Sequence, residues 1–498
     1  MSEIQRHRRR LTTVATLIGA VFALGSIAAP AYAAPIDATE TGSLTVHKYE
    51  KQDTASGLPN NGTEVTVPGY QALEGVEFTI QQVEGIDLAT NAGWADANAL
   101  TAGFADAAPR YTEQAVDAIT AQGRTLGAAE ADTTDASGEA FFGDLDLGLY
   151  LVSETSYPGG VTPSAPFLVT VPVTDPENLD DWLYDVHVYP KNSVTAAQKT
   201  VTDADDIALG DEIEFTITSD ISNEASIDGY RVVDALNSAL DYTGTAVTLS
   251  NGTAITAGTH FTVAHDEVTN TVTVDFTAAG RLMLAANHTA QVLVEITTTA
   301  NAVAEISNSA YIYPNAGSFD VDPGDPNGPQ VTPPIITKWG SFEIQKLDET
   351  GTQLAGAEFS VFDSEADARA GVKAIELDGQ TVHAVDGNGI LTLSGLRYSD
   401  WADGVQIAEE ADYQTYWLVE TTAPEGYELL AAPVEFTVTA ATTATGVDLE
   451  VENVPSNAGF MLPQTGGTGT TLIYAAGALL LAGAILMLVR VRHRKVVG

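Results

Sequence analysis

Residues 354–361 read LAGAEFSV, and residues 73–80 read LEGVEFTI. Both stretches end with apolar and polar residues in alternation, which is typical of a strand buried on one face. The similarity continues in the same order along the chain: GNGILTL at 387–393 resembles ASGEAFF at 136–142, and YWLVET at 416–421 resembles YLVSET at 150–155. Residues 34–192 and 337–455 are therefore predicted to be two copies of one domain type.

The region between these copies, residues 193–316, also contains short alternating runs, such as EIEFTI at 212–217. Many short strands without regular helices between them indicate β-sandwiches. We therefore predict an all-β fold of three tandem immunoglobulin-like β-sandwich domains. The Pro-rich residues 317–336 are expected to form a stiff linker. An Ala-rich insertion at about 91–129 is compatible with a helix or with a mobile loop.

Both ends of the chain have the composition of export and membrane segments. Four arginines before an apolar run at 11–29 and the A-x-A site at 31–33 predict a cleaved signal peptide over 1–33, a retained signal anchor being the alternative. Residues 471–489 carry no charge and, as a helix of roughly 28 Å, are long enough to span a bilayer. The basic residues in 490–498 place this end in the cytoplasm, so the body is expected outside the cell.

The composition excludes several classes of function. The chain has 21 basic and 67 acidic residues, a net charge of −46 and no cysteine. Nucleic acid is not an expected partner, because phosphate binding needs clustered Lys and Arg. The scattered histidines form no H-E-x-x-H motif, and no G-x-S-x-G elbow occurs. We therefore expect that the protein is not an enzyme and binds no cofactor or metal. The residues Asp320, Asp322 and Asp325 lack EF-hand spacing, so we interpret them as a solvated loop rather than a calcium site.

A pentapeptide precedes the apolar C-terminal span, within the segment 456–470. It consists of Leu462, Pro463, Gln464, Thr465 and Gly466. LPxTG, an apolar span and a basic tail, in this order, resemble the cell-wall sorting signal of Gram-positive surface proteins. The resemblance implies that a sortase cleaves after Thr465 and carries its carbonyl as an acyl-enzyme. The enzyme supplies the cysteine nucleophile, so this chain needs none.

A second motif ends the first domain. Residues 182–191, WLYDVHVYPK, match the pattern W-x-x-x-V-x-V-Y-P-K and resemble the pilin motif of sortase-assembled pilus shaft proteins. The resemblance implies that the Lys191 amine attacks the acyl-enzyme carrying Thr465 of another subunit. Because each subunit then joins the next head to tail, the contact does not close and a filament grows. Pro190 is expected to stop the strand and turn Lys191 out of it.

Together the motifs resemble those of a major pilin of a Gram-positive surface pilus, built from Cna-type domains. The implied partners are identical subunits, a pilus-specific (class C) sortase, a tip adhesin, a basal pilin, and peptidoglycan joined by a housekeeping sortase. The implied location is the cell wall, after a membrane-held precursor. A singly anchored adhesin or a minor pilin is the alternative; neither needs Lys191 for chain growth.

Pilins of this family often contain self-formed Lys–Asn isopeptide bonds promoted by a buried acid. The reaction requires a neutral lysine and a protonated acid, and burial favours both forms. Residues 416–427, YWLVETTAPEGY, match the family's E-box, Y-x-L-x-E-T-x-A-P-x-G-Y. The resemblance therefore implies a Lys346–Asn453 bond with Glu420 as the promoting acid.

The other two domains have corresponding candidates. In the middle domain the implied bond is Lys199–Asn308 with Asp234 as the acid, and Asp241 is a rival acid. In the first domain it is Lys48–Asn192 with Glu154. The E-box is degraded there, because Val152 replaces the leucine and the A-P-x-G-Y ending is absent. A lysine paired with a surface acid is the alternative for each site.

Overall fold

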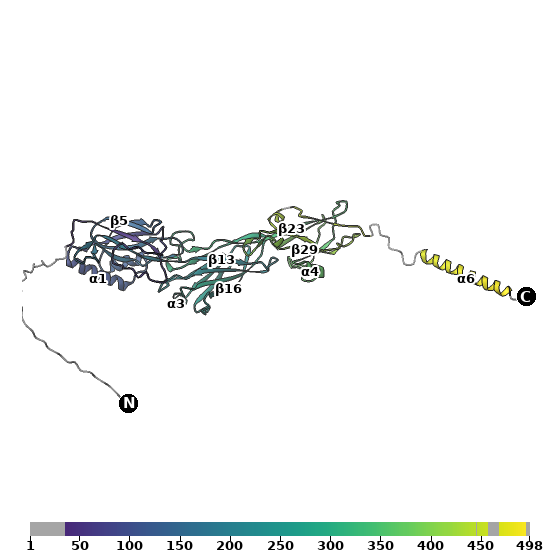
Figure 1. Cartoon of the computed structure of the whole chain (residues 1–498), viewed down its shortest axis with the longest axis horizontal. Coiled ribbons are helices and arrows are strands. Elements are labelled where there is room, and N and C mark those ends of the chain that lie inside the picture. Colours follow the sequence, from purple (N-terminus) through teal and green to yellow (C-terminus); the bar gives the residue numbers. More distant parts are fainter. Residues whose placement is uncertain (1–34, 445, 457–467, 495–498) are drawn as a thin grey trace, which may run out of the picture. The chain divides into compact units, whose positions relative to one another are not determined.

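The computed structural model describes residues 35–444, 446–456 and 468–494, and strands dominate it (Figure 1). Two compact units are present. The first extends to Tyr157 and includes Pro163–Asn192; the second consists of Pro158–Thr162 and the chain from Ser193 onward. The predicted signal peptide (1–33) and the sorting motif (462–466) lie outside the described residues.

The first unit contains two main sheets. Leu44 and Val46 on one strand, and Phe78 and Ile80 on another, are almost fully buried, so alternate side chains supply the core as the period of two requires. One sheet has the order β11-β1-β5: β1 (Gly42–His47), β5 (Glu139–Leu145) and β11 (Asp185–Val188), with β11 parallel to β1. The other has the order β4-β3-β6-β8: β3 (Glu77–Val83), β4 (Leu126–Thr133), β6 (Gly148–Ser156) and β8 (Phe167–Val171).

The Ala-rich insertion, which is compatible in sequence with a helix or with a mobile loop, forms two helices. They are α1 (Asn91–Ala107) and α2 (Thr112–Ala121), and β4 follows them. Thr90 caps α1 by accepting a hydrogen bond from the Gly93 N–H (3.0 Å). Leu100 of α1 and Ile119 of α2 are buried in the same apolar cluster as Leu149 of β6. The insertion is therefore part of the packed core of the first unit.

The second unit begins with a sandwich whose two sheets enclose a large apolar core around Phe215, Ile217 and Val294. The first sheet has the order β13-β14-β19-β16: β13 (Ala197–Thr202), β14 (Glu212–Asp220), β16 (Leu240–Leu249) and β19 (Gln291–Ala300). The second has the order β17-β18-β15-β21-β22: β15 (Arg231–Ala235), β17 (Phe261–Asp266), β18 (Thr271–Phe276), β21 (Ala310–Tyr313) and β22 (Gln330–Val331). Helix α3 (Ala278–Ala286) follows β18.

A smaller sandwich follows in the same unit, with Phe359, Val361 and Leu418 in its core. One sheet is centred on β23 (Ile335–Asp348), which pairs with β20 (Ala304–Asn308), β26 (Ile390–Arg397) and, in parallel, β31 (Leu449–Asn453). The facing sheet has the order β25-β24-β29-β30: β24 (Glu358–Phe362), β25 (His383–Ala384), β29 (Tyr416–Thr422) and β30 (Val434–Phe436).

Strand β23 serves both sandwiches of the second unit. Its first residues, Ile335–Trp339, pair with β20, and Trp339 is fully buried in the core of the preceding sandwich. Its later residues pair with β26 and β31 in the smaller sandwich. The expected linker, 317–336, contains β22, which pairs with β21, so part of this Pro-rich stretch is sheet edge. A continuous strand therefore joins the two sandwiches.

A buried arginine strengthens this junction. Arg397, only 3% exposed, ends β26 and donates from Nε to the Asp206 carbonyl and from Nη2 to the Ala204 carbonyl, both at 2.9 Å. Asp203 and Asp403 also exchange hydrogen bonds: each carboxylate accepts from the other residue's backbone N–H, at 2.6 and 3.0 Å. The loop after β13 is thus fixed to the end of β26.

Helix α6 (Thr468–Arg494) covers the segment expected to span a membrane. Within the described parts of the chain, no helix has the length and apolar character that crossing a membrane requires. The transmembrane segment expected at 471–489 therefore stays a prediction.

Replacing Arg397 with alanine should loosen the junction. The variant leaves the two loop carbonyls, and also those of Tyr398 and Trp401, without their charged donor. We expect a loss of about 2–4 kcal/mol in the free energy of unfolding of the second unit. Calorimetry and limited proteolysis of the loop at 203–211 measure the effect. Arg369→Ala is the control, because that exposed arginine pairs with Glu365 on its own helix. Equal behaviour of the two variants would contradict a role for Arg397 at the junction.

Candidate functional site

Three lysines lie inside the sandwiches. Lys48 and Lys346 are fully buried, and Lys199 is 5% exposed. Lys48 follows β1 directly, Lys199 is on β13, and Lys346 is on β23. A buried ammonium group is unfavourable unless it is paired or becomes neutral. The surroundings of each lysine therefore indicate what the buried amine can do.

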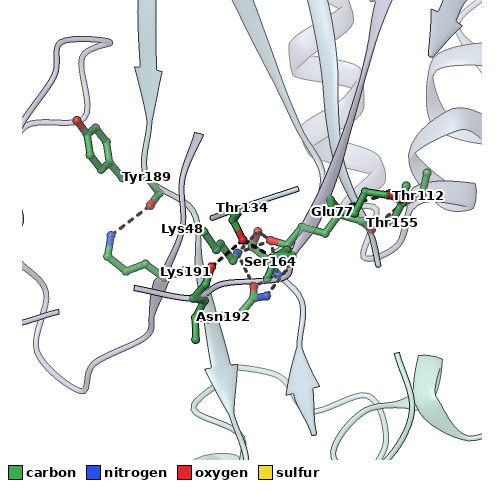
Figure 2. A network of polar contacts seen from close by, with 12 residues as sticks. Lys48, Glu77, Thr112, Thr134, Thr155, Ser164, Tyr189, Lys191 and Asn192 are labelled. Carbon is green, nitrogen blue, oxygen red and sulfur yellow. Dashed lines mark hydrogen bonds and ion pairs between the residues drawn. The ribbon is translucent and has the colours of Figure 1, made fainter. Parts of the chain in front are cut away.

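In the first unit, Lys48 contacts both predicted partners. Its Nζ pairs with Glu154 Oε1 and lies 2.6 Å from Asn192 Oδ1. The Asn192 Nδ2 group donates to Glu154 Oε2 at 2.7 Å. Amine, carboxamide and acid therefore form one buried cluster. Figure 2 shows Lys48 and Asn192 of this cluster.

The strand arrangement explains this cluster. Glu154 lies on β6, opposite Phe78 of β3, and the Phe78 ring lies 5.5 Å from the Lys48 amine. Asn192 lies on β12 (Lys191–Val194), which runs parallel to the short strand β2 (Tyr49–Glu50) that follows Lys48. Strands from the start, the middle and the end of the unit thus meet at one point.

The middle site brings Lys199 to Asp234 rather than to Asp241. Lys199 Nζ pairs with Asp234 Oδ2, and neither side chain is exposed. Burial lowers the pKa of Lys199 and raises the pKa of Asp234, so burial favours a neutral amine beside a neutral acid. Asp241 is exposed and accepts a hydrogen bond from Asn301.

Asn308, the predicted amide partner of Lys199, lies 2% exposed beside this pair. It lies close enough to Asp234 to oppose in part the burial that raises the pKa of this carboxyl group. Among the described residues, however, neither polar atom of its side chain has a partner with hydrogen-bond geometry. The amide is therefore near the pair but not bound by it.

The third site separates the lysine from the other two groups. The Asn453 Nδ2 group donates to both oxygens of Glu420 at 2.9 Å, and the Leu430 N–H donates to Glu420 Oε2 at 2.9 Å. Lys346 Nζ instead donates to the Val451 carbonyl at 2.7 Å. Burial lowers the pKa of Lys346, although the charge of Glu420 opposes this shift. Glu420 and Asn453 are therefore hydrogen bonded to each other. Lys346 is paired in register with Val451, which lies two residues before Asn453 on β31.

Lys191 has a different environment from the three buried lysines. It is partly exposed, and its Nζ donates to the Tyr189 carbonyl at 3.3 Å and lies 5.5 Å from the Tyr70 ring. Burial lowers its pKa. Figure 2 shows its side chain pointing away from the cluster of Lys48, Ser164 and Asn192. Strand β11 ends two residues before Pro190 and β12 begins after it, as expected for proline in a strand.

The pilin-motif tryptophan contacts the insertion. Trp182 lies on β10 (Trp182–Leu183) and stacks on Trp94 of α1, with ring centroids 5.4 Å apart. Further along the motif, His187 and Tyr189 stack on His47 of β1. These contacts fix the motif against the first unit on both sides of β11.

Ser164 belongs to the cluster, although no motif of the sequence includes it. Its hydroxyl donates to Glu154 Oε1, its backbone N–H donates to Asn192 Oδ1 at 2.6 Å, and Lys48 Nζ donates to its hydroxyl at 3.3 Å. Ser164 lies in the irregular segment between β7 (Val161–Thr162) and β8. Neither the E-box nor the strand pattern includes this segment, so the sequence contains no signal for it.

Known proteins match the chain along most of its length. Residues 39–193 match the N-terminal domain of the Gram-positive pilin subunit D1, residues 340–453 match the prealbumin-like fold domain SpaA, and residues 455–497 match the LPXTG cell wall anchor motif. The fimbrial subunit type 1 of Actinomyces viscosus is 31% identical over 96% of both chains. The chain belongs to the family of Gram-positive fimbrial subunits.

Two further proteins support this assignment. The fimbrial subunit type 2 of Actinomyces naeslundii is 31% identical over 92% of this pilin and 91% of its own length. The full-length major pilin SpaD of Corynebacterium diphtheriae has 26% identity and a TM-score of 0.65, covering 84% of this pilin and 98% of SpaD. The predicted all-β fold of tandem sandwich domains is confirmed.

The pilin is a structural subunit of a sortase-assembled pilus and not an enzyme. Its LPXTG motif anchors it at the cell wall of a Gram-positive bacterium, and it polymerises with other pilin subunits. The predictions of family, function and location are therefore confirmed. The residues that form the covalent bonds stay predictions.

Proposed function

We propose that this pilin forms the shaft of the pilus through an amide bond between Lys191 of one subunit and Thr465 of the next. The observation that supports this proposal most directly is the environment of Lys191. Its amine makes no ion pair among the described residues and is partly exposed, whereas Lys48 and Lys199 each pair with a buried acid. Only an amine that can reach the enzyme can attack an acyl group that the enzyme carries.

The reaction needs the neutral form of Lys191. The amine attacks the thioester between the sortase cysteine and the Thr465 carbonyl, and the thiolate leaves as the amide forms. Partial burial lowers the pKa of Lys191 and so increases the neutral fraction at a given pH. We propose a pilus-specific class C sortase for this step and a housekeeping sortase for attachment to peptidoglycan. A tip adhesin and a basal pilin complete the proposed assembly.

We further propose three intramolecular bonds, Lys48–Asn192, Lys199–Asn308 and Lys346–Asn453. The acids Glu154, Asp234 and Glu420 accept the lysine proton and deliver a proton to the leaving ammonia. The contacts among Lys48, Glu154 and Asn192 support the first bond, and the paired burial of Lys199 and Asp234 supports the second. The contact of Glu420 with Asn453 supports the third.

These bonds would suit a protein under tension. In the proposed domains 34–192 and 337–455 they connect β-strands near the start of each domain with strands at its end. Strand β31 is hydrogen bonded in parallel to β23, and β12 in the same way to β2. Force along the pilus would then pass through a covalent bond instead of separating the two strands.

Loss of Lys191 should prevent growth of the shaft. In cells that produce the pilin and its sortase, Lys191→Ala should reduce the high-mass ladder on denaturing gels to monomer. Lys373→Ala, which changes an exposed lysine with no proposed bond, should leave the ladder intact. A ladder that persists in Lys191→Ala would refute the shaft assignment and favour a singly anchored adhesin or a minor pilin.

Two variants of the middle domain test which of its two candidate acids, Asp234 or Asp241, promotes the Lys199–Asn308 bond. Asp234→Asn removes the group that can take the Lys199 proton, so a digest of the purified ectodomain should lack the joined Lys199–Asn308 peptide. Asp241→Asn is the matched control and should retain this peptide, because Asp241 is exposed and bonded to Asn301. Retention of the joined peptide in Asp234→Asn would exclude Asp234 as the promoting acid.

A further inference from the structure

Ser164 contacts all three groups of the first candidate cross-link. Its hydroxyl donates to Glu154 Oε1 and accepts from Lys48 Nζ (3.3 Å), and its N–H donates to Asn192 Oδ1 (2.6 Å) and, at 3.3 Å, to Glu154 Oε1. Figure 2 shows Ser164 beside Lys48 and Asn192.

We propose that Ser164 is a catalytic residue for formation of the Lys48–Asn192 bond. Its N–H stabilises the negative charge that develops on Asn192 Oδ1, and its hydroxyl directs the proton of Glu154 to the oxygen that faces the leaving group. This inference rests on the cross-link proposed above for the first domain and adds a residue to its mechanism.

The reaction can be written with its atoms balanced. Glu154 takes a proton from the Lys48 ammonium group, and the neutral Nζ attacks Asn192 Cγ. Glu154 then returns this proton to Nδ2, and the C–N bond to Nδ2 breaks as ammonia leaves. The Glu154 carboxylate takes the second proton from Nζ, so the reaction ends with a neutral amide, ammonia and protonated Glu154. Lysine and the asparagine side chain become one amide, one ammonia leaves, and no oxidant or other reactant is needed.

The backbone N–H of Ser164 lies where this reaction develops negative charge. During the attack the Asn192 Oδ1 atom becomes an oxyanion, and a fixed N–H donor at hydrogen-bond distance stabilises it. The corresponding oxygens of Asn308 and Asn453 have no hydrogen-bond partner within the described residues. The first site alone of the three therefore has a protein donor on the carbonyl that is attacked.

The hydroxyl of Ser164 acts on the acid. Glu154 has two inequivalent oxygens: Oε1 faces Lys48 and Ser164, and Oε2 faces Asn192 Nδ2 at 2.7 Å. A hydroxyl that donates to Oε1 favours the acid proton on Oε2 instead, because a protonated Oε1 is a poorer acceptor. The proton is then located beside the nitrogen that must leave.

In the first domain, Ser164 supplies the donor to the acid that Leu430 supplies in the third domain. In the third site, the Leu430 N–H that follows the E-box binds Glu420 Oε2. The first domain has no A-P-x-G-Y ending, and the N–H and hydroxyl groups that reach its acid come from Ser164. The first domain therefore has protein donors to its acid and to its amide although its E-box is degraded.

The test is a time course of bond formation in the full chain. The pilin is made by cell-free synthesis, and samples are denatured in acid at intervals and digested. The joined Lys48–Asn192 peptide is then measured by mass spectrometry, with the Lys346–Asn453 peptide of the same molecules as the internal standard. The variants are Ser164→Ala, which removes only the hydroxyl, and Ser164→Thr, which retains the hydroxyl and the N–H.

We expect the first bond to form at least about tenfold more slowly in Ser164→Ala. The hydroxyl directs the proton of Glu154, and a positioned acid–base group such as Glu154 contributes typically 10²–10⁴-fold. Ser164→Thr should restore a rate close to that of the wild type, and the Lys346–Asn453 peptide should form at the same rate in all three proteins. The near-ultraviolet circular dichroism of the Trp94–Trp182 pair reports whether the first unit is folded. Slow bonding in a folded Ser164→Ala protein, restored by threonine, separates catalysis from a structural role.

The outcomes distinguish this inference from the proposal on which it rests. If Ser164→Ala forms the bond as fast as the wild type, the hydroxyl of Ser164 is not catalytic and the proposed cross-link stands. If the wild-type chain never forms the Lys48–Asn192 peptide, the first-domain cross-link and the role of Ser164 are both refuted. Glu154→Gln should abolish the peptide and serves as the negative control.

Discussion

Each of the three sandwiches buries a lysine amine among apolar strands, and this burial constrains the chemistry of its core. A charged ammonium group in such a core is unfavourable, and an acid brought close to it can be equally unfavourable in its charged form. For Lys199 and Asp234, burial shifts both pKa values toward the neutral pair. The neutral amine and the protonated acid are also the reactive forms, so the same burial that costs stability prepares a covalent bond. The proposed cross-links would remove the buried charge permanently.

Much of this organisation follows from the strand pattern. Val232 and Asp234 alternate on β15 and both face inward, whereas Asp241 follows the buried Leu240 and faces outward. The period of two therefore favours Asp234 over its rival. The family resemblance implies that Lys48, Glu154 and Asn192 meet although they are far apart in the sequence. The structure places their side chains in hydrogen-bond contact with one another.

The parts that the sequence did not reveal come from irregular segments and from contacts across the fold. Ser164 lies outside every strand, and no local pattern indicates that its N–H reaches Asn192. Arg397 binds carbonyls almost two hundred positions earlier in the chain, and its strand pattern gives no sign of this partner. The Pro-rich stretch 317–336 was expected to be a separate linker because its prolines suit extended chain. Prolines are equally compatible with the edge of a sheet, where β22 lies.

The central claim is that buried lysines become amides, and the intact mass of the purified wild-type ectodomain tests it most directly. Measured under denaturing conditions, the mass should be lower than the sequence requires by three molecules of ammonia, one for each of Lys48, Lys199 and Lys346. A mass equal to that of the unmodified sequence would contradict the account, because all three lysines would then remain free amines in the folded pilin.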